Sequence, residues 1–207
     1  MQSYNGLVSG RQDSAMPSFP TLGPLTHFRL KGTSGLFIGD SHEEVAHLVA
    51  LRINMHNLAD KGVKVLFLEY FFQQQTKISI RSATHIYQHL VARNFLHNDE
   101  MPRNIEDLLA EANDYAIDVW GLDVPSADPR SSPEANKGFA KIAWRTSKAL
   151  NTLWANWVTE VMRKSYANRN FAIFAGARHG PILTKCGLNG MLLYQWLTRN
   201  VEYVDLK

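Results

Sequence analysis

The sequence predicts an α/β fold with a mostly parallel, mixed central sheet of about five strands flanked by helices. Short, nearly continuous apolar runs, typical of strands covered on both faces, alternate with longer segments in which apolar residues recur at helical spacing. This alternation requires crossover connections and therefore favours parallel strands. With 45% hydrophobic and 20% charged residues, the 207-residue chain has the composition of a globular protein and can bury a sizeable core.

Residues 1–33 differ from the rest of the chain. Gly and Pro recur there in a Ser-containing stretch without a periodic pattern, which indicates a linker or an extended N-terminal arm. Within it, the alternation at residues 26–31 could form an edge strand. A single α/β domain is therefore expected over residues 34–207, and the linker-like arm indicates that the chain is part of a longer polypeptide.

Regular structure is expected from the apolar run at residues 35–39, which predicts a buried strand that ends in a tight turn. Ser41 and Glu44 have the spacing of a capping box, so a helix is expected over residues 42–61. The apolar run at residues 63–68 predicts the next strand. The further expected elements are helices at 79–97 and 104–115, a strand at 116–124, a helical segment at 134–166, a strand at 171–176, a helix at 188–198 and a strand at 201–206.

Ionisable side chains gather where the expected strands end, in chain order Asp40 and His42, Glu69, Asp123, and Arg178 and His179. The carboxyl ends of parallel strands meet at one edge of the sheet, where α/β folds bind their ligands. The form Gly-x-x-His follows an apolar run twice, so we expect His42 and His179 to meet in space. Asp123 fits a turn role equally well, and Arg178 could serve only to neutralise the cluster.

Two imidazoles and a carboxylate at one edge suit two kinds of chemistry. His42, Glu69 and His179 could hold a divalent metal ion that lowers the pKa of a bound water. Alternatively, a His–Glu pair could act directly as general base and orienting group, so that water is activated without a metal. Both routes lead to a hydrolase, and the sequence leaves the choice between them open.

The composition does not support several other classes of function. The net charge is only +3 and the basic residues do not cluster, so no nucleic-acid partner is expected. No apolar stretch approaches the roughly 20 residues that span a bilayer, so no transmembrane segment is expected. No signal peptide is visible at the N-terminus. The single cysteine, Cys186, cannot form an intrachain disulfide.

The order of these residues resembles that of a known superfamily. Gly39-x-x-His42, a strand ending in Glu69 and a late Gly176-x-x-His179 are similar to the pattern of Tiki/TraB metalloproteases, ChaN-like haem-binding proteins and erythromycin esterases. A related domain occurs in dermonecrotic toxins of the Pasteurella type.

The resemblance covers residues 33–207 and includes a segment similar to the helix before the last His strand of these families, with Asn151, Trp154, Ala155 and Val158. Leu150 stands where the family often has an Arg.

The resemblance implies an α/β sheet of the ChaN and erythromycin-esterase type. Its cleft would hold His42, Glu69 and His179 as catalytic residues, which would also be the ligands of any metal ion. It also places Arg52 at a position like an active-site Arg of the esterases. Substrate-binding roles are expected for Arg52 and for three strand-end residues, Asp40, Asp123 and Arg178.

Three functions are compatible with this pattern. The first is a hydrolase of ester or peptide bonds, acting on a small-molecule or peptide substrate in the cleft, with a divalent metal ion as its candidate cofactor. The second is a non-enzymatic domain of a larger bacterial toxin or effector, delivered as part of the secreted protein. The third is haem binding, in which Tyr70 could offer an axial phenolate.

Overall fold

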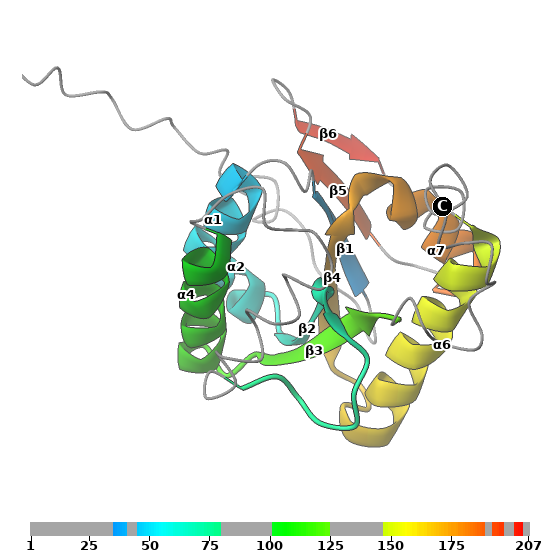
Figure 1. Cartoon of the computed structure of the whole chain (residues 1–207), viewed down its shortest axis with the longest axis horizontal. Helices are drawn as coiled ribbons and strands as arrows, with labels where there is room; N and C mark the ends of the chain where they lie inside the picture. The colour runs from blue at the N-terminus through cyan, green and yellow to red at the C-terminus, as the bar shows by residue number, and fades with distance from the viewer. Residues whose placement is uncertain are drawn as a thin grey trace, which may run out of the picture.

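The computed structural model describes, besides the backbone of two strands near the C-terminus, residues 35–40, 45–79, 101–124 and 147–188. It confirms an α/β fold in which helices flank a sheet (Figure 1). The expected N-terminal arm and nearly all of the helix expected at residues 79–97 lie outside the described residues.

Within the part of the chain that the structure describes, six strands form one sheet in the order β3-β2-β4-β1-β5-β6. They are β1 (Gly35–Asp40), β2 (Val63–Phe72), β3 (Asp118–Asp123), β4 (Asn170–Gly176), β5 (Leu192–Trp196) and β6 (Val201–Val204). All neighbouring strands are parallel except β5 and β6, which are antiparallel. The predicted, mostly parallel sheet is therefore confirmed. Its described part has six strands, and β4 lies between β2 and β1.

One predicted element is wrong, because the segment expected to be a helix at residues 188–198 contains the strand β5. This strand pairs with β1 in parallel register, from Leu36 opposite Leu192 to Gly39 opposite Gln195. A short apolar run fits a buried strand as well as a helix. Pairing decides in favour of the strand, because the backbone groups on this side of β1 need hydrogen-bond partners.

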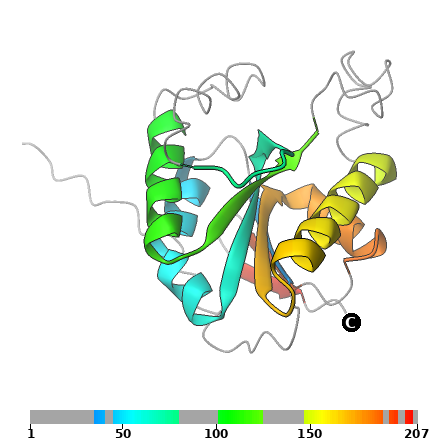
Figure 2. The same ribbon diagram turned by 90° about the horizontal axis from the view of Figure 1, so that it is seen from below.

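Helices cover both faces of the sheet (Figure 2). One face carries α1 (Val45–Ile53), α2 (Met55–Asp60) and α4 (Met101–Asp114), and the other carries α6 (Lys148–Ser165) and α7 (Gly180–Lys185). The single helix expected at residues 42–61 is divided at Asn54, whose side-chain N–H donates to the Ala50 carbonyl over 2.7 Å. Asn side chains that bond to nearby backbone compete with helix formation. Within the described ranges, no helix is both long enough and apolar enough to span a bilayer.

Alternate residues of the strands build two hydrophobic cores, one on each face of the sheet. On β2, Leu68 and Tyr70 belong to the core under α1, α2 and α4, whereas Phe67 belongs to the core under α6. Side chains of a strand alternate between the two faces. The alternation therefore directs Glu69 to the face of α6, and it directs Asp40, at the end of β1, to the face of α1.

The carboxyl end of β2 contains a bulge. β2 pairs with β3 regularly up to Leu68 and again at Phe72, and the register shifts in between. Gly121 of β3 lies against this bulge, where a Cβ atom would be 2.0 Å from the backbone oxygen of Phe72. Only glycine allows two backbones to approach so closely. The bulged stretch contains Glu69 and Tyr70, so it shapes the edge at which the strand-end residues gather.

Replacing Gly121 by alanine is expected to destabilise the protein by about 1–3 kcal/mol, the usual cost of overpacking a well-packed site. The added Cβ must displace main chain, because the atoms that it meets are backbone atoms of β2. Urea unfolding followed by circular dichroism measures the change. A free energy of unfolding equal to that of the wild type would contradict the close approach.

A polar network holds the opposite, amino-terminal end of the strands together. Tyr166 Oη donates to Asp118 Oδ2 over 2.7 Å and accepts from Trp120 Nε1 over 3.1 Å. Lys77 Nζ donates to the other carboxylate oxygen of Asp118 over 2.7 Å. Burial, together with the hydrogen bond to the Asp118 carboxylate, raises the pKa of Tyr166 to about 12.

This raised pKa predicts a loss of stability at high pH. A tyrosine titrates near pH 10 in an unfolded chain, so the folded protein holds the Tyr166 proton more tightly. The contribution of protonated Tyr166 to the free energy of unfolding is fully present below about pH 10 and is lost as the pH rises through about 12. Urea unfolding at about pH 9 and about pH 11 should show a larger loss for the wild type than for Tyr166→Phe. Equal losses in the two proteins would contradict the raised pKa.

Candidate active site

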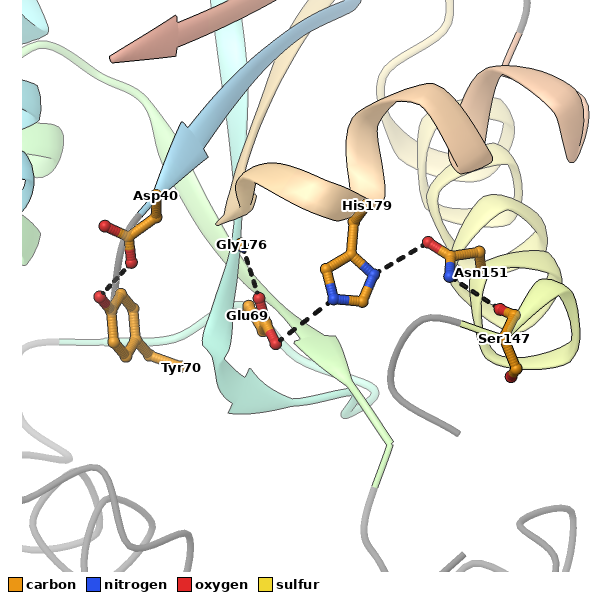
Figure 3. A network of polar contacts seen from close by, with 7 residues as sticks. All are labelled: Asp40, Glu69, Tyr70, Ser147, Asn151, Gly176 and His179. Carbon is orange, nitrogen blue, oxygen red and sulfur yellow. Dashed lines mark hydrogen bonds and ion pairs between the residues drawn. The ribbon is translucent and has the colours of Figure 1, made fainter. Parts of the chain in front are cut away.

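Two clusters of polar side chains lie at the carboxyl edge of the sheet, where α/β folds bind ligands (Figure 3). The cluster on the face of α6, called the His179 cluster below, consists of Glu69, Asn151 and His179. The cluster on the face of α1, called the Asp40 cluster below, consists of Asp40, His47 and Tyr70.

His179 is oriented by the first turn of α6. It ends the short 3₁₀ helix η4 (Ala177–His179), which follows β4 directly. Nδ1 of His179 lies 3.0 Å from Asn151 Oδ1, and Asn151 Nδ2 donates to the Ser147 carbonyl over 2.8 Å. Because the amide group of Asn151 donates to Ser147, its oxygen faces His179 and accepts. Nδ1 therefore carries a proton, which leaves the lone pair of the neutral imidazole on Nε2.

Trp154 and Ser147 support this orientation. The indole of Trp154 is fully buried and packs against the imidazole of His179, with ring centroids 4.4 Å apart and planes inclined by 31°. Trp154 follows Asn151 by three positions, so the two side chains share one face of α6. Ser147 caps this helix, because its Oγ accepts from the Leu150 N–H over 3.2 Å. Ser147 thus both accepts a hydrogen bond from Asn151 and fixes the start of α6.

Glu69 completes the His179 cluster from the bulge of β2. Its Oε2 accepts from the Gly176 backbone N–H over 2.8 Å, and its Oε1 lies 4.0 Å from Nε2 of His179. Glu69 is 2% exposed and His179 is 5% exposed. A buried carboxylate is costly unless it is hydrogen-bonded or paired, and the Gly176 N–H supplies one such hydrogen bond. The cluster therefore presents an oriented imidazole beside a buried carboxylate.

The Asp40 cluster joins two strands that are not neighbours. Tyr70 Oη donates to Asp40 Oδ2 over 2.6 Å, and His47 Nδ1 lies 3.3 Å from Asp40 Oδ1. All three side chains are buried. Asp40 ends β1 and Tyr70 lies in β2, and β4 runs between these two strands. The Tyr70–Asp40 hydrogen bond therefore spans one whole strand.

Of the three residues predicted to be catalytic, the structure places Glu69 and His179 side by side. The third, His42, lies outside the described residues, so its distance from His179 stays a prediction.

The residues predicted to bind substrate lie apart from one another. Asp40 is in the cluster on the face of α1, and Asp123 is fully buried at the end of β3. Arg52 pairs with Asp107, which joins α1 to α4 at the surface. Arg178 is exposed, although it directly precedes His179. The structure therefore does not bring these four predicted residues into one cluster.

The described residues do not by themselves make up a metal centre. Among them, no group of three His, Cys, Asp or Glu side chains is arranged to hold a metal ion. Glu69 and His179 offer one oxygen and one nitrogen ligand, whereas protein zinc sites have at least three protein ligands. The remaining predicted ligand, His42, is outside the described ranges.

Asn151 and Trp154 are not among the predicted site residues, and only the resemblance of their helix singles them out. Their spacing of three positions puts an amide and an aromatic ring on one helix face, which is the signal that could identify them. Tyr70, considered as a haem ligand, has a buried hydroxyl group that donates to Asp40.

The fold is shared with domains of bacterial toxins and effectors. The type III effector HopBA1 is 23% identical, with a TM-score of 0.53 over 70% of this chain and 67% of its own. A chain from a crystal structure of bacterial protein toxins is 19% identical, with a TM-score of 0.56 over 94% of this chain and 39% of its own.

RRSP, a MARTX toxin effector domain from Vibrio vulnificus CMCP6, is 16% identical, with a TM-score of 0.52 over 83% of this chain and 35% of its own. At these identities the likeness shows the fold alone, and the chain spans well under half of the last two proteins. No protein-family model and no curated protein sequence matches the chain.

Proposed function

We propose that the chain is a hydrolytic domain of a bacterial toxin or effector, which cleaves an ester or peptide bond with His179 as general base. The observation that carries the proposal is the buried series of contacts from Asn151 through His179 to Glu69. A general base is oriented in this way when one imidazole nitrogen is held by a neighbouring side chain and the other is available for proton transfer. The fold shared with toxin and effector domains supports the biological setting.

The proposed reaction uses one water molecule. Nε2 of His179 takes a proton from the water while the water oxygen forms a bond to the carbonyl carbon of the substrate. The bond between that carbon and the leaving oxygen or nitrogen then breaks, and the leaving atom takes the proton from Nε2. The imidazole thus returns to its neutral form, and Asn151 accepts from the Nδ1–H throughout.

Glu69 favours the charged form of His179 that exists between these two proton transfers. Its Oε1 lies 4.0 Å from Nε2, close enough for a carboxylate to stabilise an imidazolium. The same distance is too long for a direct hydrogen bond, but one water molecule can bond to both atoms. The carboxylate can therefore help to hold the attacking water as well as the imidazolium.

His42 is the third residue of the proposed site, as the resemblance to the Tiki/TraB, ChaN and erythromycin-esterase superfamily implies. It follows β1, and the end of β1 pairs with the end of β4, directly before η4. In a metal-dependent form of the reaction, His42, Glu69 and His179 would be the ligands, and the ion would lower the pKa of a bound water.

Hydrolysis of a panel of ester and peptide substrates tests the proposal. The wild type should cleave at least one member, and Glu69→Gln should slow that cleavage by about 10- to 100-fold, because the imidazolium loses its carboxylate partner. Glu160→Gln is the matched control, since Glu160 is exposed on α6, and it should retain the wild-type rate. No cleavage across the panel, or equal rates for the two variants, would contradict the proposal.

The same assay separates the two routes to hydrolysis. A rate that a chelator leaves unchanged supports direct general-base catalysis by His179. A rate that is lost with the chelator and restored by a divalent ion supports the metal-dependent form.

A non-enzymatic toxin domain is the second candidate. The chain spans only 39% and 35% of the two toxin chains that share its fold, so an activity could reside in another part of a larger protein. For such a domain, Glu69→Gln would leave the action of the whole protein on cells unchanged. A hydrolytic domain predicts that this action is weakened in Glu69→Gln and kept in Glu160→Gln.

A further inference from the structure

Near the end of β2, side-chain hydrogen bonds are made where the regular pairing of the strand is interrupted. The pairs between β2 and β4 end at Leu68 opposite Phe174, and the register between β2 and β3 shifts between Leu68 and Phe72. Glu69 and Tyr70 fall within this interval. Backbone pairing with β3 holds Leu68 and Phe72 on either side of it, and within it the side chains of Glu69 and Tyr70 make hydrogen bonds of their own.

These bonds end on two residues that lie opposite each other. Glu69 Oε2 accepts from the Gly176 N–H, and Tyr70 Oη donates to Asp40 Oδ2. Asp40 and Gly176 are register partners, the last pair between β1 and β4. Two consecutive residues of β2 thus bind, on opposite faces of the sheet, to the ends of β1 and β4 at the same level (Figure 3).

We infer that Tyr70 and Asp40 are positioning residues of the His179 cluster, although neither belongs to it. Their hydrogen bond on the face of α1 fixes the end of β2, so that Glu69 on the face of α6 keeps its bond to Gly176 and its place beside His179. Adjacent residues of a strand share one rigid peptide unit, so a shift of Tyr70 carries Glu69 with it.

The Tyr70–Asp40 bond has the properties that such a role requires. Its length of 2.6 Å is typical of a hydroxyl group that donates to a carboxylate, which is stronger than a bond between neutral groups. The Tyr70 ring is 1% exposed and lies beside the Phe174 ring, with centroids 6.1 Å apart. The packed ring fixes the direction in which the Tyr70 hydroxyl group points, and the Asp40 carboxylate accepts its hydrogen bond.

The exchange rate of the Gly176 amide tests this inference without an activity assay. Hydrogen exchange measured by NMR reports how often the Gly176 N–H leaves Glu69. Tyr70→Phe keeps the ring and removes the hydroxyl group, and it should speed exchange at Gly176 by about tenfold or more. Amides in the middle of β4, such as that of Ile173, should keep their wild-type rates. Tyr115→Phe is the matched control, because Tyr115 is exposed, and it should leave both rates unchanged.

Two outcomes would overturn the inference. Equal acceleration of all amides in β4 would mean that the bond only stabilises the fold as a whole, and an unchanged rate at Gly176 would mean that Glu69 is held without it. If Tyr70→Phe does not fold, Asp40→Asn serves as the second variant. It replaces a charged acceptor by a neutral one, so it should weaken the bond and speed exchange at Gly176 by a smaller factor. No acceleration in that variant overturns the inference as well.

The catalytic meaning of the positioning pair depends on the proposed function, whereas the exchange experiment does not. If the hydrolase proposal holds, Tyr70→Phe should lower kcat with KM nearly unchanged, because Glu69 acts on the imidazole and not on substrate binding. Faster exchange at Gly176 in a protein without hydrolytic activity would leave the inference standing and count only against the proposed function.

Discussion

Replacing His179 by glutamine is expected to lower the rate of hydrolysis by about 100- to 10,000-fold, the usual contribution of a positioned general base. The glutamine side chain can still bond to Asn151, but it cannot take a proton from water. The fold should persist, because glutamine is close to histidine in size and polar character. Initial rates on the substrate identified by the panel give the size of the effect.

His56→Gln is the matched control for this prediction. His56 is exposed on α2, and its Nδ1 lies 3.0 Å from the Ile53 carbonyl, three positions earlier in the chain. The control variant should hydrolyse at the wild-type rate. A His179→Gln protein that is folded by circular dichroism and as active as the control would exclude His179 as the base.

Replacing Trp154 by alanine is expected to destabilise the protein by about 3–5 kcal/mol, the range for removing a large buried aromatic side chain. The indole is fully buried in the core under α6 and packs on the imidazole of His179. Its removal leaves a cavity at the base of the candidate site. Urea unfolding monitored by far-ultraviolet circular dichroism measures the loss, and the remaining tryptophans make fluorescence a less specific probe.

Trp154→Phe tests whether the stability that Trp154 contributes comes from packing. Within the described residues, the indole N–H of Trp154 has no hydrogen-bond partner, so phenylalanine removes volume without breaking a bond. Its cost should therefore be well below that of alanine, at about 1–2 kcal/mol. If Trp154→Phe lowers the free energy of unfolding as much as Trp154→Ala does, packing is not the main contribution of this side chain.

The strands were predictable because each is marked by an apolar run within its own residues. Near-continuous apolar runs predict β1, β2 and β4, each bounded by polar or glycine residues. The run that forms β5 has the same character, and only its pairing with β1 distinguishes the strand from a helix. The interruption at Asn54 likewise depends on a side-chain bond to Ala50 that spacing alone does not reveal.

The candidate site was predictable to the extent that it lies at strand ends. The rule that the carboxyl ends of parallel strands meet at one edge predicts that Glu69 lies near His179. In the structure, Glu69 Oε1 lies 4.0 Å from His179 Nε2. The rule does not say to which face a strand-end side chain turns, and Asp40 turns to the other face. The contacts of Asn151 and Trp154 with His179 depend on how α6 lies against η4. Tertiary packing sets this arrangement, and the sequence pattern of either segment does not reveal it.

The most direct test of the central claim, that Glu69 and His179 act as one catalytic unit, is the rate of hydrolysis in a double-mutant cycle. The rates of Glu69→Gln, His179→Gln and the protein with both substitutions are compared with that of the wild type. If Glu69 acts only through the imidazole, the double variant should be no slower than His179→Gln alone, because residues that act as a unit have non-additive effects. A double variant slowed by the product of the two single losses would contradict the claim.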